Sequence, residues 1–188
     1  MFTDGTEITV TTAQIADFGL YSGRELSDDE FGELRRELAK GTSKARAMRM
    51  LGSRDLSSRE IEKRLINKGD SHETARETVL WLEKIGAVDD TEYAAAIALY
   101  YAKKGYGKTR IRNELFKRGI DRELWDEAMS GLDGMEDAVG ELLKKKLKGE
   151  SGKDDLRKAV DMLCRRGFSY SEAREAVNRY LEELGIRN

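Results

Sequence analysis

Three segments of this chain follow one pattern, in which a short helix-forming stretch ends at a glycine. They are residues 58–69 (SREIEKRLINKG), 105–119 (GYGKTRIRNELFKRG) and 155–167 (DLRKAVDMLCRRG). Their closing glycines lie 50 and 48 residues apart. Self-similarity at a nearly constant period is typical of repeat proteins, in which each unit buries its apolar face on its neighbours. The pattern therefore favours an array of similar small helical units.

Equivalent positions of the three units carry apolar residues at the spacing of three and four that one face of a helix requires. Before the glycines these positions are Ile61, Ile111 and Ala159, then Leu65, Leu115 and Leu163, then Ile66, Phe116 and Cys164. After them they are Ala75, Trp125 and Ala173; Thr78, Ala128 and Ala176; Val79, Met129 and Val177; and Leu82, Leu132 and Tyr180. We expect these residues to form the core, and the glycines to end each helix in the left-handed conformation.

The predicted fold is all-α: an elongated, curved array of three tandem three-helix repeats with a small N-terminal extension. The extension spans residues 1–41, and the repeats span residues 42–88, 89–132 and 133–188. In the extension, Asp4-Gly5 is a turn signal and residues 7–10 alternate like a strand. A helical turn follows over residues 12–18, and a capping box at Ser27 begins a helix that we expect to end at Gly41. Beyond residue 43 we predict nine helices in three triplets, and Asp121 is expected to cap the third helix of the second repeat.

Composition narrows the possible functions. The 188 residues include 34 basic and 36 acidic side chains, so a uniformly basic nucleic-acid-binding surface is excluded and a local basic patch is not. A single cysteine cannot form an internal disulfide, which fits a reducing cytosol. No apolar run approaches the ~20 residues of a membrane span, and the N-terminus lacks the pattern of a signal peptide. We therefore predict a cytoplasmic protein.

No set of residues in the sequence indicates catalysis, a metal site or a cofactor. His72 is the one histidine, and its place in the first turn of a predicted helix indicates a surface residue. Cys164 occupies an apolar repeat position, which favours packing over nucleophilic chemistry. The turn GYGKT at residues 105–109 resembles the end of a phosphate-binding loop, but it lacks the glycine spacing and the preceding strand of that motif.

Positive charge is concentrated in the second repeat. From residue 103 to residue 118 there are seven basic side chains and one acidic one, Glu114. On the predicted helix, Arg110 and Lys117 share one face and Lys108 and Arg112 share another, and Ile111 and Leu115 point inward between these faces. A solvated helix surface explains any one of these charges. The cluster as a whole, with Tyr106, favours a surface that binds an acidic partner or a phosphate backbone.

At these residues the chain resembles the RecX family, the bacterial regulators of the RecA recombinase. The resemblance is carried by SREIEKRLINKG, by VDDTEYAAAIALYYAKKGYGKTRIRNELFKRGID and by LCRRGFSYSEAREAV, and covers roughly residues 45–180. It implies a non-enzymatic negative modulator that lies in the groove of the RecA–DNA filament. Such a modulator affects ATP hydrolysis, strand exchange and coprotease activity in DNA repair, homologous recombination and the SOS response.

On this resemblance the predicted partners are the RecA filament and, in addition, single- or double-stranded DNA. The residues expected to contact them are Lys103, Lys104, Tyr106, Lys108, Arg110, Arg112, Lys117 and Arg118, with Arg59, Lys63, Arg165 and Arg166 as secondary candidates. Two alternatives stay open: a helix-turn-helix-like DNA-binding protein that acts without RecA, and a helical scaffold for an unrelated protein.

Overall fold

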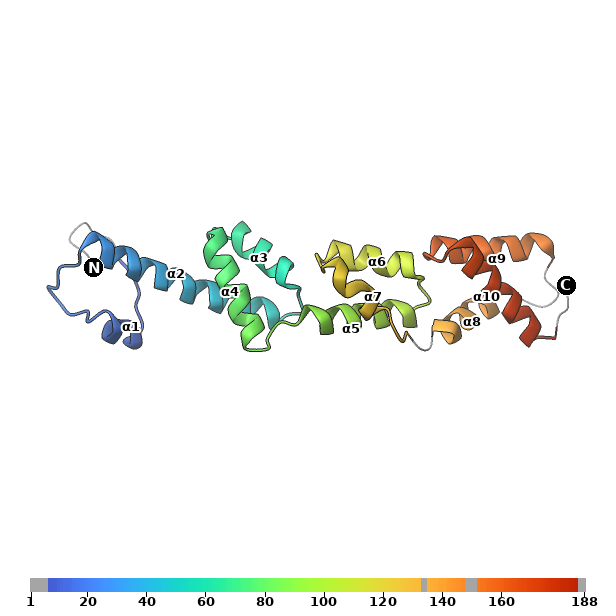
Figure 1. Ribbon diagram of the computed structural model, residues 1–188, viewed down its shortest axis with the longest axis horizontal. Coiled ribbons are helices and arrows are strands. Elements are labelled where there is room, and N and C mark those ends of the chain that lie inside the picture. Colours follow the sequence, from blue (N-terminus) through green and yellow to red (C-terminus); the bar gives the residue numbers. More distant parts are fainter. Residues whose placement is uncertain (1–6, 133–134, 148–151, 186–188) are drawn as a thin grey trace. The chain divides into compact units, whose positions relative to one another are not determined.

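The computed structural model describes residues 7–132, 135–147 and 152–185, and over these residues the chain is all-α, without a strand (Figure 1). Every predicted helical triplet is present. The α-helices are α1 (Thr12–Asp17), α2 (Asp28–Leu51), α3 (Ser58–Asn67), α4 (His72–Lys84), α5 (Asp90–Lys103), α6 (Lys108–Lys117), α7 (Trp125–Ala128), α8 (Met135–Lys146), α9 (Lys153–Arg165) and α10 (Tyr170–Glu183). A 3-10 helix, η1 (Arg122–Leu124), precedes α7.

The chain divides into two compact units. The first comprises Met1–Arg54 and Ile61–Ile85, and the second comprises Asp55–Glu60 and Gly86–Asn188. The second unit therefore contains α5 to α10 together with the segment that begins α3. The elongated shape and the boundaries of the repeats remain predictions.

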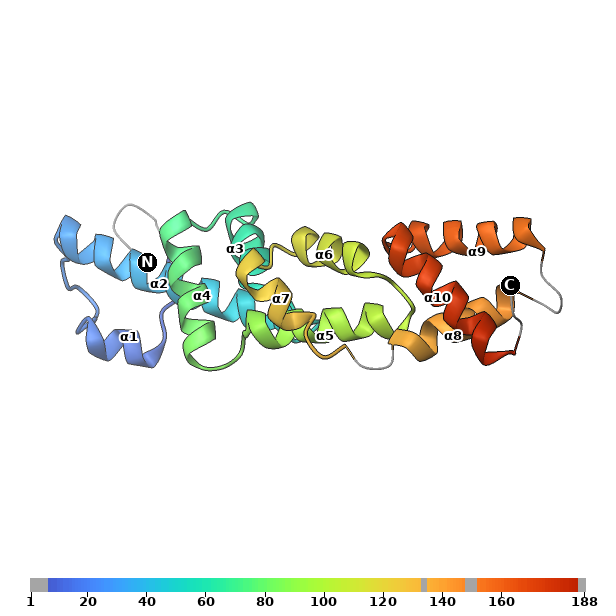
Figure 2. The ribbon, with the colours of Figure 1, turned by 45° about the vertical axis from the view of Figure 1, so that its right-hand side comes forward.

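In the first unit, α2 packs against α4 (Figure 2). The buried Ser43 links the two helices, because it accepts a hydrogen bond of 2.9 Å from the Thr78 hydroxyl and donates one of 2.9 Å to Asp70. Arg46 forms an ion pair with the same Asp70 carboxylate. The helix end expected at Gly41 is wrong: α2 continues through Gly41 to Leu51. These contacts to α4 and to the turn before it hold the helix together across the glycine.

The N-terminal segment contains helix where the sequence predicts it but not the expected strand. Thr11 forms a capping box with Gln14 and begins α1, and Ser27 forms one with Glu30 and begins α2. Residues 7–10 have no strand, and the expected turn at Asp4-Gly5 lies outside the described residues. Two short strands are marginal without further packing, which explains why the alternation at residues 7–10 does not produce a sheet.

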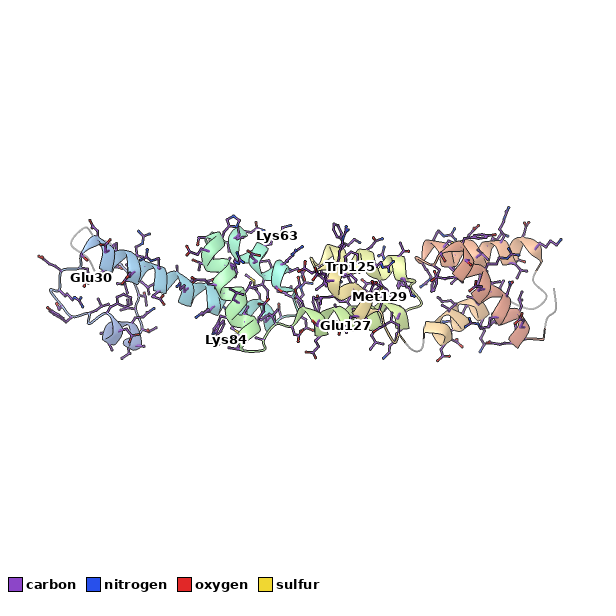
Figure 3. The ribbon with its side chains drawn as sticks, viewed as in Figure 1. Glu30, Lys63, Lys84, Trp125, Glu127 and Met129 are labelled. Carbon is purple, nitrogen blue, oxygen red and sulfur yellow. The ribbon has the colours of Figure 1, made fainter. Side chains whose placement is uncertain are left out.

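In the second unit, each helical triplet has its own apolar core. The core of α5 to α7 contains Ile97, Ile111 and Leu115, and half-buried Trp125 packs against it. The core of α8 to α10 contains Leu143, Leu163 and Val177, and half-buried Cys164 packs against it as predicted. Met129, which directly follows α7, is buried in the core of α5 to α7, and Figure 3 labels it together with Trp125.

The repeat alignment places equivalent residues in equivalent surroundings. Ile61, Ile111 and Ala159 are fully buried, and so are Leu65, Leu115 and Leu163. Gly69, Gly119 and Gly167 all have left-handed backbones, with φ of 94°, 71° and 94°, as the predicted helix ends require.

Two details of the alignment are wrong. Phe116, expected in the core, is 64% exposed, whereas its equivalents Ile66 and Cys164 are half-buried. Asp121 forms no capping hydrogen bond. Its carboxylate lies 2.7 Å from Arg59 instead, and the helix that it was expected to cap is reduced to η1 and the four residues of α7.

Candidate functional site

The basic segment of the second repeat begins with a tight turn between α5 and α6. Gly105 (φ 70°) reverses the chain after α5, and Gly107 is the residue before the first turn of α6. Ile111 and Leu115 are fully buried against α5, which fixes the rotation of α6 about its axis. The basic side chains of α6 are therefore distributed over its remaining surface, as the sequence predicts.

Three tyrosines lie beside this turn and are surrounded by cations. The Tyr101 ring centroid is 5.3 Å from that of Tyr100 and 5.5 Å from that of Tyr106. Four basic groups lie within about 6 Å of these rings, the range in which a cation is attracted to an aromatic face. Lys104 is 4.1 Å from Tyr100, Arg166 is 4.9 Å and Arg110 is 5.8 Å from Tyr106, and Arg118 is 6.0 Å from Tyr101. We call these seven residues the cation–aromatic cluster.

Glu114, the one acidic residue among the basic side chains, organises the cluster. It is 6% exposed and forms ion pairs with Arg110 (3.2 Å), Lys117 (3.1 Å) and Arg118 (2.8 Å). The hydrogen bond from Arg118 is the main reason that the pKa of Glu114 is lowered to about 2. Burial alone would lower the pKa of Arg118, but its hydrogen bonds to Glu114 and to tyrosines raise it. Both groups are therefore ionised at neutral pH.

Arg166 reaches the cluster through a contact between two turns. The amide of Gly107 donates to the carbonyl of Arg166 (3.0 Å), and the amide of Thr109 donates to the carbonyl of Gly167 (3.1 Å). The Arg166 guanidinium in turn donates to the carbonyl of Lys104 (2.9 Å). A Cβ at Gly107 would lie 2.4 Å from Gly167, so the two backbones are in direct contact.

A matching contact occurs one repeat earlier, and we call each of the two an inter-repeat joint. The hydroxyl of Ser57, just before α3, donates to the carbonyl of Arg118. A Cβ at Gly119 would lie 2.9 Å from the Cβ of Arg59. In both joints, the start of a second helix contacts the glycine turn that ends the next repeat's second helix. The GYGKT turn thus uses two of its amides for packing, which leaves them unable to bind a phosphate.

The predicted binding residues fall into two groups. Lys104, Tyr106, Arg110 and Arg118 meet in the cluster with Arg166, and Lys117 joins them through Glu114. The others lie outside it. Arg112 pairs with the exposed Asp126 at 3.3 Å, Arg59 pairs with Asp121, and Lys103, Lys108 and Arg165 are exposed. Lys63 is exposed on α3, in the first unit (Figure 3).

Sequence reasoning missed Glu114, Tyr100 and Tyr101 as members of the site. The spacing of Arg110, Glu114 and Arg118 at successive intervals of four was a usable signal, because such residues are neighbours on a helix. Tyr100 and Tyr101 gave no comparable signal, because tyrosines near the end of an apolar helix are usually interpreted as core residues.

The described residues give no sign of a metal-binding cluster. They contain no group of three or more histidine, cysteine or acidic side chains that could hold a metal ion. A groove of about 680 Å³ lies between α8 and α10, but neither histidine nor cysteine lines it. None of the described helices combines the length and apolar composition that crossing a bilayer requires.

The fold defines a class: an all-helical protein built from three-helix units. Comparison with known proteins identifies the family. Residues 89–129 match the family model described as the second three-helix domain of RecX. The regulatory protein RecX of Xanthomonas axonopodis pv. citri (strain 306) is 34% identical over 152 residues, which cover 79% of this chain and 93% of that protein. The RecX protein of Stenotrophomonas maltophilia (strain R551-3) is 34% identical over 136 residues, which cover 70% of this chain and 83% of that protein.

Solved structures agree with the fold. A crystal structure of regulatory protein RecX superposes with a TM-score of 0.72 at 19% identity and covers 90% of this chain and 86% of its own. RecX from Lactobacillus salivarius gives a TM-score of 0.65 at 19% identity and covers 79% of this chain and 98% of its own. The chain belongs to the RecX family of regulatory proteins.

Proposed function

We propose that this chain is a non-enzymatic, negative modulator of the RecA recombinase that binds in the groove of the RecA–DNA filament. It slows ATP hydrolysis and thereby strand exchange and coprotease activity, in the cytoplasm, where recombination and repair take place. The observation that carries the proposal is the cation–aromatic cluster, six of whose seven residues lie within the segment that matches the RecX domain model, with Arg166 as the exception.

The cluster and the exposed cations around it have different roles in this proposal. Arg110 and Arg118 are held by Glu114 and by the tyrosine rings, so they give the surface its shape. Lys108 and Arg112 are exposed and four residues apart on one face of α6. These side chains make charge-assisted contacts with carboxylates or phosphates of the filament.

The decisive experiment follows ATP hydrolysis by RecA assembled on single-stranded DNA as the protein is added. The proposal predicts a dose-dependent slowing. The variant Lys108→Gln/Arg112→Gln removes two exposed charges and should need several-fold more protein for the same slowing. The control Arg157→Gln/Lys158→Gln removes two exposed charges from α9, where each pairs with an aspartate three residues earlier, and should behave like the wild type.

Two results would contradict this proposal in different ways. Unchanged ATP hydrolysis at equimolar protein and RecA would reject the function itself. Slowing that is equally strong with both double variants would place the binding surface elsewhere.

The helix-turn-helix alternative has weaker support. In the second repeat, the third helix, which would read the DNA, is only four residues long. In the first repeat, the exposed face of α4 carries both signs, with Glu73, Arg76 and Lys84. Tight, steeply salt-dependent binding to free duplex DNA in the absence of RecA would favour this alternative.

A further inference from the structure

Helix α5 is apolar on every side, and yet one side is uncovered. Residues 93–102 are ten consecutive apolar residues, and a helix of this kind is normally buried all round. Its inner side is buried, as expected: Ala94, Ala98 and Ala102 are fully covered and Ile97 is 6% exposed. On the outer side, Leu99 is 40% and Tyr100 is 54% exposed, and Ala95 and Ala96 are exposed beside them.

The exposed residues form a regular seam. Glu92, Ala96, Leu99 and Lys103 are spaced by four, three and four residues, so they lie in one row along the helix, the spacing at which two helices pack side by side. All four are exposed. The row begins with an acidic side chain, ends with a basic one and has a small and a large apolar residue between them.

We infer that this face binds a second copy of the chain, with the two α5 helices antiparallel about a two-fold axis. The axis passes midway between residues 92 and 103. Glu92 of one copy then meets Lys103 of the other, and Ala96 meets Leu99. A two-fold interface makes each contact twice, so both ends of the seam carry an ion pair and each leucine faces an alanine.

Self-complementarity selects this occupant. A parallel pairing would instead set Glu92 against Glu92 and Lys103 against Lys103, which repel each other. Lys104 lies 4.1 Å from the Tyr100 ring and hydrogen-bonds to its hydroxyl, so the ring is already positioned at the edge of the seam.

One helix pair buries less area than the roughly 1,600 Å² of a standard protein interface, so the dimer is weak. Sedimentation equilibrium of the full chain from about 10 μM to about 1 mM should show the average mass rise above 21.3 kDa toward twice that value. The variant Leu99→Asp should weaken association at least tenfold. The control Leu80→Asp, at a leucine of α4 that is 56% exposed, should leave association unchanged.

A charge exchange tests the orientation. Glu92→Lys alone and Lys103→Glu alone each bring like charges together, so each variant should associate several-fold more weakly than the wild type. An equimolar mixture of the two variants restores both ion pairs and should associate as the wild type does, and so should the double variant. Circular dichroism verifies that each variant is folded.

Three results would overturn the inference. They are a protein that stays monomeric at about 1 mM, association that Leu99→Asp leaves intact, and a mixture of the charge variants that associates no better than either alone. A monomeric protein whose effect on RecA is lost in Leu99→Asp would assign this face to the recombinase.

Discussion

Neutralising Glu114 tests the central ion-pair network of the site directly. Its pKa, lowered from 4.5 to about 2, means that the folded state binds a proton there more weakly than the unfolded chain does. At about 1.4 kcal/mol per pKa unit, the ionised carboxylate stabilises the fold by at most about 3–4 kcal/mol. Two of its three partners, Arg110 and Lys117, have side chains 44% and 60% exposed, so solvent screens part of this energy. We therefore expect Glu114→Gln to cost about 2 kcal/mol at pH 7.

The measurement is thermal unfolding followed by circular dichroism. For a chain of this size, about 2 kcal/mol lowers Tm by about 4–8 °C. The carboxylate contributes fully above pH 4.5, and its contribution decreases as the pH falls toward 2. More than half of it is lost by about pH 3. The difference in Tm between wild type and Glu114→Gln should therefore shrink by more than half between pH 7 and pH 3.

The control is Glu127→Gln, which removes an exposed carboxylate from α7 in the same unit (Figure 3). Its Tm should stay within about 1 °C of the wild type. A Tm for Glu114→Gln that is unchanged at pH 7 would show that the network does not stabilise the fold. A Tm difference as large at pH 3 as at pH 7 would show that the cost arises from packing and not from charge.

Three further predictions concern glycines and can be checked by thermal melting. Gly107→Ala should cost about 2–3 kcal/mol, because its Cβ would meet the Gly167 backbone, whereas Gly152→Ala, at the matching position before α9 but in open space, should be nearly neutral. Gly119→Val should lower the melting midpoint further than Gly131→Val. Both positions have φ near 70°, but only a Cβ at residue 119 would also overlap with the Arg59 side chain. Gly41→Ala should stabilise the protein by about 0.5–1 kcal/mol, because Gly41 lies within α2 and a Cβ there would meet nothing. A lower melting midpoint would instead indicate that a helix ends at Gly41.

Most of the helices could be predicted because their signals are local. Capping residues such as Ser27 and Ser169 mark the helix starts, and the periodic apolar residues mark the buried faces. Gly41 shows the limit of such signals. A glycine that ends a helix and one that lies within it look alike in the sequence, and the difference here is made by Ser43 and Arg46, whose partners are more than 20 residues away.

The site was predictable as a region but not as an arrangement. The excess of positive charge between residues 103 and 118 is a local property, and it indicates the turn and the helix beside which the cation–aromatic cluster lies. The role of Glu114 depends on the rotation of α6, and the arrival of Arg166 depends on packing between turns some 60 residues apart. The outward position of Phe116 likewise depends on that rotation, which the repeat alignment alone does not determine.

The inter-repeat joints connect the repeat architecture to the site. In each joint, the glycine that ends a second helix has a left-handed backbone and is also packed closely against residues from the preceding repeat. A side chain at this position would therefore be disfavoured both by the backbone conformation and by steric overlap. The arginine before that glycine, Arg118 or Arg166, offers its carbonyl to the joint and its side chain to the cluster. The contact at each arginine's carbonyl therefore also helps to hold that cation in place, and a loosened joint should weaken partner binding even where every charged residue is retained.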